Sequence, residues 1–241
     1  MARIRADLLL VARGLAESRA KARAAIEAGG VWANGSLVSS ASDMIEEEAT
    51  IEATPAHAWV SRGGVKLAHA LDVFSVDPAG RVCMDVGAST GGFTHVLLQR
   101  GAAHVYAVDV GTAQLHASLR DDPRVTNLER TDARKLSRTL IPEAPSLIVC
   151  DASFIGAAKV LLVPMSLAAA HADLIVLIKP QFEAGPNAGK RGVLNEGAAR
   201  DAAQATMIAL DGVEHFKVVR MIDSPIAGGD GNLELLLHAR R

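Results

Sequence analysis

From residue 81 to residue 238, short apolar runs alternate with segments of helical periodicity, and this alternation restricts the fold more than any other feature. Strands that alternate with helices in this way are typical of a doubly wound, mostly parallel sheet with helices packed on it. The strands are predicted at 81–86, 104–108, 124–128, 147–150, 174–178, 217–222 and 233–238, and the helices at 65–74, 92–99, 112–120, 157–167 and 196–210.

The first sixty residues show a different pattern and predict a separate small unit. Short helices are expected at 5–13 and after Ser18, whose hydroxyl is a suitable N-cap. Asn34-Gly35 stands between two strand-like runs and predicts a hairpin. An acidic turn at 43–48 and a short strand at 50–52 follow. We therefore expect a small α+β domain at 1–53, a linker at 54–60 and an α/β domain at 61–241.

Two further features bear on the compartment in which the chain works. The apolar run at 8–12 is too short for a secretion signal, and the apolar stretch at 160–178 is interrupted by polar residues and a proline. Cys83 and Cys150 each precede an Asp at a predicted strand end, which indicates reduced cytosolic thiols rather than a disulfide or a metal site. We expect a cytoplasmic monomer that holds no metal and contacts no membrane.

A glycine-rich turn, G-x-x-x-G-G, follows the first strand of the large domain, with an Asp two residues before its first glycine. A dinucleotide site would read G-x-G-x-x-G. S-adenosylmethionine (SAM) has no pyrophosphate and carries a sulfonium and an ammonium group, so an acid at the turn suits it. Asp109, which ends the next strand, is placed for the ribose hydroxyls, and Asp132 for the adenine amino group. The predicted SAM-binding residues are Asp85, Gly87, Ala88, Ser89, Thr90, Gly91, Gly92, Phe93, Asp109, Val110, Asp132 and Ala133.

Two lysines and two acids stand at predicted element ends: Lys66, Asp151, Lys179 and Glu234. The carboxyl ends of neighbouring parallel strands face one crevice, so Asp151 and Lys179 are expected to meet the cofactor there. Methyl transfer to a ribose 2′-hydroxyl requires that the hydroxyl proton be taken up. A lysine can do this when desolvation lowers its pKa.

These motifs resemble the FtsJ-like RNA 2′-O-methyltransferases, and in particular the TlyA family, whose members are often labelled hemolysin A. The matching segments are 85–93, Asp151, 179–183 (KPQFE) and 231–234 (GNLE). FtsJ-like turns usually read Pro-Gly-Gly, whereas this chain has Thr90 before the two glycines, as in the TlyA branch.

The resemblance implies a Rossmann-like, class I SAM-dependent methyltransferase fold. It also implies that Lys66, Asp151, Lys179 and Glu234 form a catalytic tetrad in which Lys179 acts on the 2′-hydroxyl. Its implied substrate is ribosomal RNA or a ribosomal subunit, with cytidine as the implied nucleoside.

Residues 3–53 resemble an S4-type RNA-binding domain. Arg19 and Arg23 lie four residues apart and share a helix face suited to phosphates, and Lys21 lies off that face. Few aromatic residues are present, which favours recognition of folded RNA by its shape and backbone. The predicted RNA-binding residues are Arg3, Arg5, Arg13, Arg19, Lys21 and Arg23.

Two other functions are weighed against this one. A membrane-lytic protein is suggested by the hemolysin label, but no strongly amphipathic cationic segment supports it. An RNA-binding assembly factor that keeps SAM only as a ligand is the second, and the intact tetrad argues against it. The stretch 185–197, with Lys190 and Arg191, is expected either to contact RNA or to close over the site.

Overall fold

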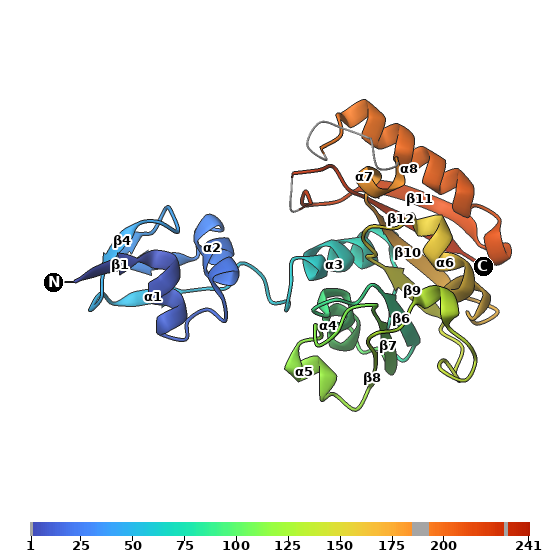
Figure 1. Cartoon of the computed structure of the whole chain (residues 1–241), viewed down its shortest axis with the longest axis horizontal. Helices are drawn as coiled ribbons and strands as arrows, with labels where there is room; N and C mark the ends of the chain where they lie inside the picture. The colour runs from blue at the N-terminus through green and yellow to red at the C-terminus, as the bar shows by residue number, and fades with distance from the viewer. Residues whose placement is uncertain (1, 185–192, 229–230) are drawn as a thin grey trace. The chain divides into compact units, whose positions relative to one another are not determined.

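The computed structural model describes residues 2–184, 193–228 and 231–241, and it divides the chain into two compact units, Met1–Ala58 and Trp59–Arg241 (Figure 1). The residues expected as a linker are thus shared between the units. Lys190 and Arg191 lie outside the described residues. Within the described residues, no helix has the length and apolar character needed to cross a membrane.

The small unit consists of two helices and two small antiparallel sheets. Ser18 accepts a hydrogen bond from the Lys21 amide and caps the second helix, as predicted. Asn34 and Gly35 both have positive φ, and their hairpin is confirmed. The elements are α1 (Ala6–Ala12), α2 (Arg19–Glu27), the pair β1 (Arg3–Arg5) and β4 (Met44–Glu46), and the sheet of β3 (Ser36–Leu37), β2 (Val31–Ala33) and β5 (Ile51–Ala53).

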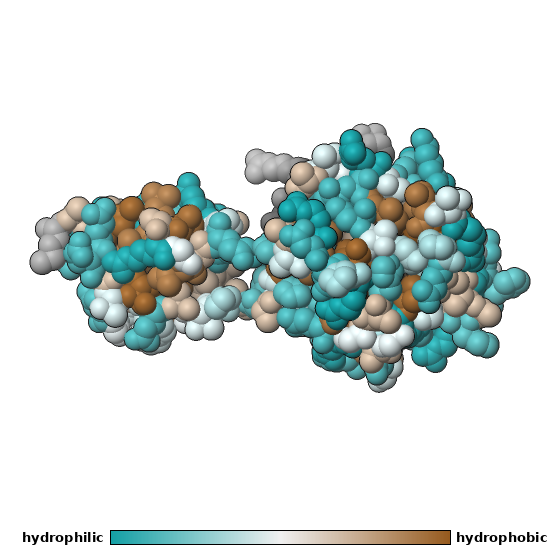
Figure 2. All heavy atoms as spheres, turned by 90° about the horizontal axis from the view of Figure 1, so that it is seen from below, coloured by the Kyte–Doolittle hydropathy of each residue, from teal (hydrophilic) through white to brown (hydrophobic). Residues whose placement is uncertain are grey.

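The pair β1–β4 corrects the sequence prediction, which gave only a turn at 43–48. Arg3 pairs with Glu46 across some forty residues of sequence, so no local pattern signals the partner. Hydrophobic residues show on the face of the molecule seen in Figure 2. Several large hydrophobic side chains of the small unit are exposed, which is common in a domain of this size: Leu8, Leu15, Trp32, Leu37 and Met44.

The large unit is built on a seven-stranded sheet in the order β11-β12-β10-β9-β6-β7-β8, and the predicted mostly parallel sheet is confirmed. β12 pairs antiparallel with both β10 and β11, and the pairings from β10 to β8 are parallel. The strands are β6 (Val82–Val86), β7 (His104–Val108), β8 (Val125–Leu128), β9 (Leu147–Cys150), β10 (Asp173–Ile178), β11 (Lys217–Asp223) and β12 (Leu235–Arg240).

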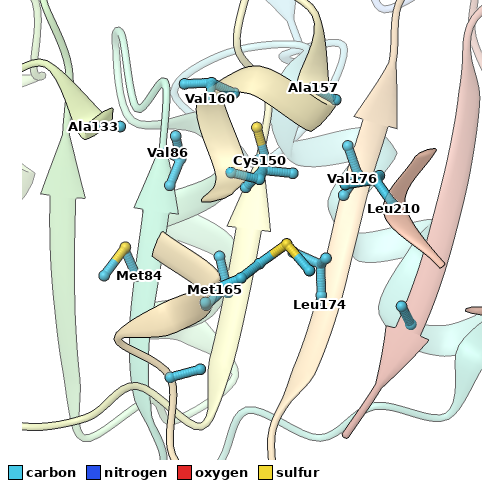
Figure 3. Packing of buried hydrophobic residues seen from close by; sticks show 14 of the residues in the cluster. Met84, Val86, Ala133, Cys150, Ala157, Val160, Met165, Leu174, Val176 and Leu210 are labelled. Atoms are coloured by element: carbon cyan, nitrogen blue, oxygen red, sulfur yellow. The ribbon is translucent and has the colours of Figure 1, made fainter. Parts of the chain in front are cut away.

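Helices cover both faces of this sheet (Figure 1). In β10, Leu174 and Val176 face α6 and α8, whereas Ile175 and Leu177 face α3 and α4, as the period of two requires. Figure 3 shows the first of these cores, in which Met165 of α6 lies against the sheet. The helices are α3 (Gly63–Phe74), α4 (Gly92–Gln99), α5 (Ala117–Arg120), α6 (Ala157–Ser166), α7 (Pro180–Glu183) and α8 (Glu196–Leu210), with 3-10 turns at Ala133–Lys135 and Val213–His215.

The helix predicted at 112–120 was wrong in its first half. Only Ala117–Arg120 is helical, and Ala113 has φ +53°. The carboxylate of Glu129 accepts hydrogen bonds from the amides of residues 113, 114 and 115, at 2.7 to 2.9 Å. Together with the positive φ of Ala113, these hydrogen bonds hold the segment as a loop against Glu129.

Candidate active site

The predicted site residues of the large unit gather at the edge of the sheet formed by the carboxyl ends of its parallel strands. Asp109 follows β7, Asp151 follows β9 and Lys179 follows β10. Glu234 directly precedes β12 rather than lying within it. Because β12 runs antiparallel to β10, its first residue is at the same edge, and Glu234 joins the site from the end of the chain.

A cavity of about 700 Å³ opens beside this edge, a volume typical of small-molecule sites. Among the described residues, its lining includes three aspartates and one arginine, so the carboxylates of this lining outnumber its cations. Six of the predicted cofactor residues line it: Gly87, Ser89, Asp109, Val110, Asp132 and Ala133. The others lie outside the lining: Asp85, Ala88, Thr90, Gly91, Gly92 and Phe93.

Asp85 is fully buried behind the glycine turn and holds the start of α4. Its Oδ2 accepts from the Thr94 amide at 2.9 Å and from the Thr94 hydroxyl at 2.7 Å. Its Oδ1 is buried and has no hydrogen-bond partner among the described residues. Burial raises the pKa of the Asp85 carboxyl to about 7, and the Asp151 and Asp109 charges add to the rise. Asp85 therefore stabilises the turn from the protein interior, through Thr94, rather than from the cavity.

The glycines of the turn are required by close packing. Gly87 has φ +84°, and a Cβ at this position would lie 2.9 Å from the backbone of Ala152. Gly91 has φ +92°, and a Cβ there would clash with the side chain of Leu119. A Cβ on Gly92 would clash with the Ser61 hydroxyl. The turn thus contacts the loop after β9 directly, without an intervening side chain.

Asp109 ties two loops of the cavity together. Its Oδ2 accepts from the Ser89 amide at 2.8 Å and its Oδ1 from the Gly111 amide at 2.7 Å. Asp132 caps a 3-10 turn, and its hydrogen bonds with Arg134 lower the pKa of the Asp132 carboxyl to about 2. Both carboxylates line the cavity.

Lys179 and Asp151 form an ion pair next to the cavity. The Nζ of Lys179 lies 2.6 Å from Oδ1 of Asp151 and also donates to the Asp151 carbonyl oxygen at 3.2 Å. A third contact joins Nζ to the Ser153 hydroxyl at 2.7 Å. Only 12% of the Lys179 side chain is exposed. Among the described residues, the ammonium thus makes two hydrogen bonds, to the Asp151 carbonyl and the Ser153 hydroxyl, and lies in ion-pair contact with the Asp151 carboxylate.

Lys66 and Glu234 form the second pair of the predicted tetrad. Lys66 donates to Oε2 of Glu234, and both side chains are buried. A Cβ built on Gly63 would lie 3.4 Å from Oδ2 of Asp151, so the start of α3 lies against Asp151. The structure thereby brings all four predicted tetrad residues to one edge, as two ion pairs.

Sequence reasoning missed two residues of this edge. Ser153 contacts Lys179, and Phe154 lines the cavity with 88% of its surface exposed and its ring 4.9 Å from that of Phe182. Both residues lie shortly after Asp151, in a loop at the end of a strand, and this position in the sequence could have indicated them. Trp59 packs on Gly64 of α3 and edge-on to His95 of α4.

In the small unit, a buried carboxylate organises two of the predicted RNA-binding arginines. Asp7 is fully buried and accepts from both Arg5 and Arg19, at 2.8 to 3.2 Å. These two guanidinium groups hold the pKa of the Asp7 carboxyl well below its usual range. Arg13 donates instead to the carbonyl oxygens of Ala49 and Glu47.

Of the remaining cations of the small unit, Lys21 pairs with Glu17 at 2.5 Å. Arg3 and Arg23 are exposed. The predicted patch therefore contains three kinds of residue. Arg5 and Arg19 bind Asp7, Arg13 and Lys21 bind other groups of the unit, and Arg3 and Arg23 are exposed.

Two family models match the chain. The FtsJ-like methyltransferase model matches residues 59–241, and the S4 domain model matches residues 4–51. A Mycobacterium tuberculosis protein named 16S/23S rRNA (cytidine-2'-O)-methyltransferase TlyA is 46% identical over 99% of this chain and 90% of its own length. Hemolysin A of Brachyspira hyodysenteriae is 38% identical over 98% of this chain and 99% of its own.

A solved structure agrees with these relatives. A Streptococcus thermophilus protein that carries a hemolysin name superposes with a TM-score of 0.76 and 36% identity, covering 100% of this chain and 89% of its own. The similarity extends through both units of the chain rather than through one of them alone.

Proposed function

The chain belongs to the FtsJ-like methyltransferase family, and we propose that it transfers a methyl group from SAM to the 2′-hydroxyl of a cytidine ribose in ribosomal RNA. The observation that carries this proposal is the pairing of Lys179 with Asp151 and of Lys66 with Glu234 at the edge of a cavity. This arrangement supplies a proton acceptor beside a site large enough for a nucleoside cofactor.

The residues that line the cavity suit SAM. Asp109 would hold the ribose hydroxyls and Asp132 the adenine end. Gly87 and Ser89 line the same cavity. The excess of carboxylates favours a ligand that carries positive charge. When bound, SAM supplies an electrophilic methyl group on sulfur.

Within the tetrad, we assign proton uptake to Lys179 and its orientation to Asp151. A neutral amine accepts the proton of the 2′-hydroxyl as the oxygen gains the methyl group, and Asp151 stabilises the ammonium that results. Lys66 and Glu234 are buried, and they hold the start of α3 to the strand edge.

The small unit would hold the RNA through its phosphates. Asp7 fixes Arg5 and Arg19 in one orientation, which lowers the entropy lost when both guanidinium groups bind a phosphate. Arg3 and Arg23, both exposed, would add electrostatic attraction. Because the proposed substrate is ribosomal RNA, we expect the protein to act in the cytoplasm, as a monomer.

The test is methyl transfer from radiolabelled SAM to naked ribosomal RNA and to isolated small and large subunits, with the 2′-O-methyl positions then mapped. Wild-type protein is expected to label a cytidine, and the variant Lys179→Met to label none. Lys159→Met is the matched control, because Lys159 is an exposed lysine of α6. Full labelling by Lys179→Met would contradict the assigned chemistry.

Two outcomes would favour other functions. Binding of SAM and RNA without turnover on any ribosomal substrate would favour an assembly factor. Leakage of liposomes at protein concentrations that leave an unrelated protein inert would favour the lytic activity that the name of the Brachyspira relative carries.

A further inference from the structure

Among the described residues, the Ser153 hydroxyl is the one contact of the Lys179 amine that can either accept or donate a hydrogen bond. The other two contacts are oxygens of Asp151, a carboxylate oxygen at 2.6 Å and a carbonyl oxygen at 3.2 Å, and both only accept. The hydroxyl of Ser153, 2.7 Å from Nζ, can accept from an ammonium and can donate to a neutral amine. A neutral Lys179 can therefore keep its N–H bond to the Asp151 carbonyl and direct its lone pair at Ser153.

The positions of the two residues relative to the cavity agree with this. Ser153 lines the cavity and is exposed, whereas Lys179 is absent from the described lining and is largely buried. Ser153 is therefore part of the cavity wall, and the Lys179 amine that it contacts lies behind this wall.

The loop that carries Ser153 is fixed at both ends. On one side, a Cβ on Gly87 would lie 2.9 Å from Ala152, so the cofactor turn packs directly on the loop. On the other side, Oε1 of Glu183 accepts from the Ala157 amide at 2.8 Å. Glu183 and Lys179 belong to the same KPQFE segment. This segment therefore fixes the position of the Lys179 amine and also that of the loop whose Ser153 contacts it.

We propose that Ser153 is a catalytic residue that relays the proton of the substrate hydroxyl to Lys179, an inference that rests on the proposed function. The 2′-oxygen forms a bond to the methyl carbon, and the electron pair of the broken carbon–sulfur bond stays on sulfur. The proton of the 2′-hydroxyl passes to the Ser153 oxygen while the Ser153 proton passes to neutral Lys179. The serine ends unchanged and the lysine ends as an ammonium ion.

The test compares Ser153→Ala with Ser153→Thr in single-turnover methyl transfer to ribosomal RNA. Ser153→Ala is expected to lose about 100-fold in rate, in the range typical of acid–base groups, and Ser153→Thr, which keeps a hydroxyl, to stay within about tenfold of wild type. Affinities for SAM and RNA should be unchanged in both. Ser166→Ala is the matched control, since Ser166 is an exposed serine bonded to its own helix.

A second readout separates a relay from a purely structural role. In mixtures of light and heavy water, the wild-type rate should fall along a curve, because two protons move in one step. The rate of Ser153→Ala should fall along a straight line. A wild-type rate in Ser153→Ala, or a loss confined to binding, would overturn the relay. A wild-type protein that methylates nothing would instead overturn the proposed function.

Discussion

Lys66 and Glu234 stand 168 residues apart in the sequence, yet they form an ion pair in which only 9% and 4% of the two side chains are exposed. The pair joins the first helix of the large unit to its last strand. The attraction within a buried ion pair offsets much of the desolvation cost of its two charges, whereas one charge left buried without its partner is strongly unfavourable.

Glu234→Gln is therefore expected to lower the free energy of unfolding by about 3–5 kcal/mol, because Lys66 stays buried without a countercharge. Urea denaturation measures the loss. The double variant Lys66→Met/Glu234→Gln should recover part of this stability while remaining inactive in methyl transfer. Equal losses in the single and double variants would show that the pair is not energetically coupled.

Asp85 makes stability depend on pH with an unusual sign. Burial raises the pKa of its carboxyl from 3.8 to about 7 in the folded protein, so between these values the folded state binds more protons than the unfolded state. The contribution of Asp85 to stability is thus fully present at low pH and is lost as the pH rises from about 4 to about 7, by at most about 4 kcal/mol.

Asp85→Asn, which mimics the protonated acid, should remove this component of the pH dependence and should be more stable than the wild type above about pH 7. Thermal unfolding across this pH range measures it. A variant with Asp121, an exposed aspartate, changed to Asn is the control and should keep the wild-type profile.

Asp109→Asn is expected to weaken SAM binding about tenfold or more, equivalent to about 1.4 kcal/mol. The carboxylate accepts two backbone amides from different loops, and an amide side chain can match only one of them. Calorimetric titration with SAM measures the effect, and Asp121→Asn again serves as the control. Unchanged affinity would remove Asp109 from the proposed cofactor site.

Arg19 and Arg13 are expected to differ although both are arginines of the small unit. Arg19→Ala should weaken RNA binding and reduce the slope of log affinity against log salt concentration by about 1. Arg13→Ala should leave that slope unchanged and lower the stability of the small unit by about 1 kcal/mol, because Arg13 binds carbonyl oxygens of the unit itself. Equal salt slopes for the two variants would count against this division of roles.

The central strands β6, β7, β9, β10 and β12 could be predicted because burial on both faces makes each of them a nearly continuous apolar run. The place of β12 between β10 and β11 could not, since sheet order depends on pairing between distant segments. The same holds for β1 with β4. The loop at 113–115 could not be predicted either, because the carboxylate that binds its amides belongs to Glu129, outside the segment whose periodicity indicated a helix.

Much of the candidate site could be predicted once the strands were located. Asp109, Asp151 and Lys179 follow strands directly, and parallel strands bring such positions to one edge. Ser153 could not be found in this way, because its contact with Lys179 depends on the path of a loop in which Phe154 has φ +65°. The burial of Asp85 was also unexpected, since a carboxylate at a cofactor turn is more readily pictured facing the ligand.

The missing side chain at Gly87 has a consequence for protein engineering. Because Gly87 rests on the backbone of Ala152, the segments at 85–93 and 151–156 share one packing surface and act as a single module. A chimera that takes only one of the two segments from a relative is expected to pack poorly where they meet. Recombination between family members should therefore succeed when both segments are exchanged together, with crossover points placed outside them.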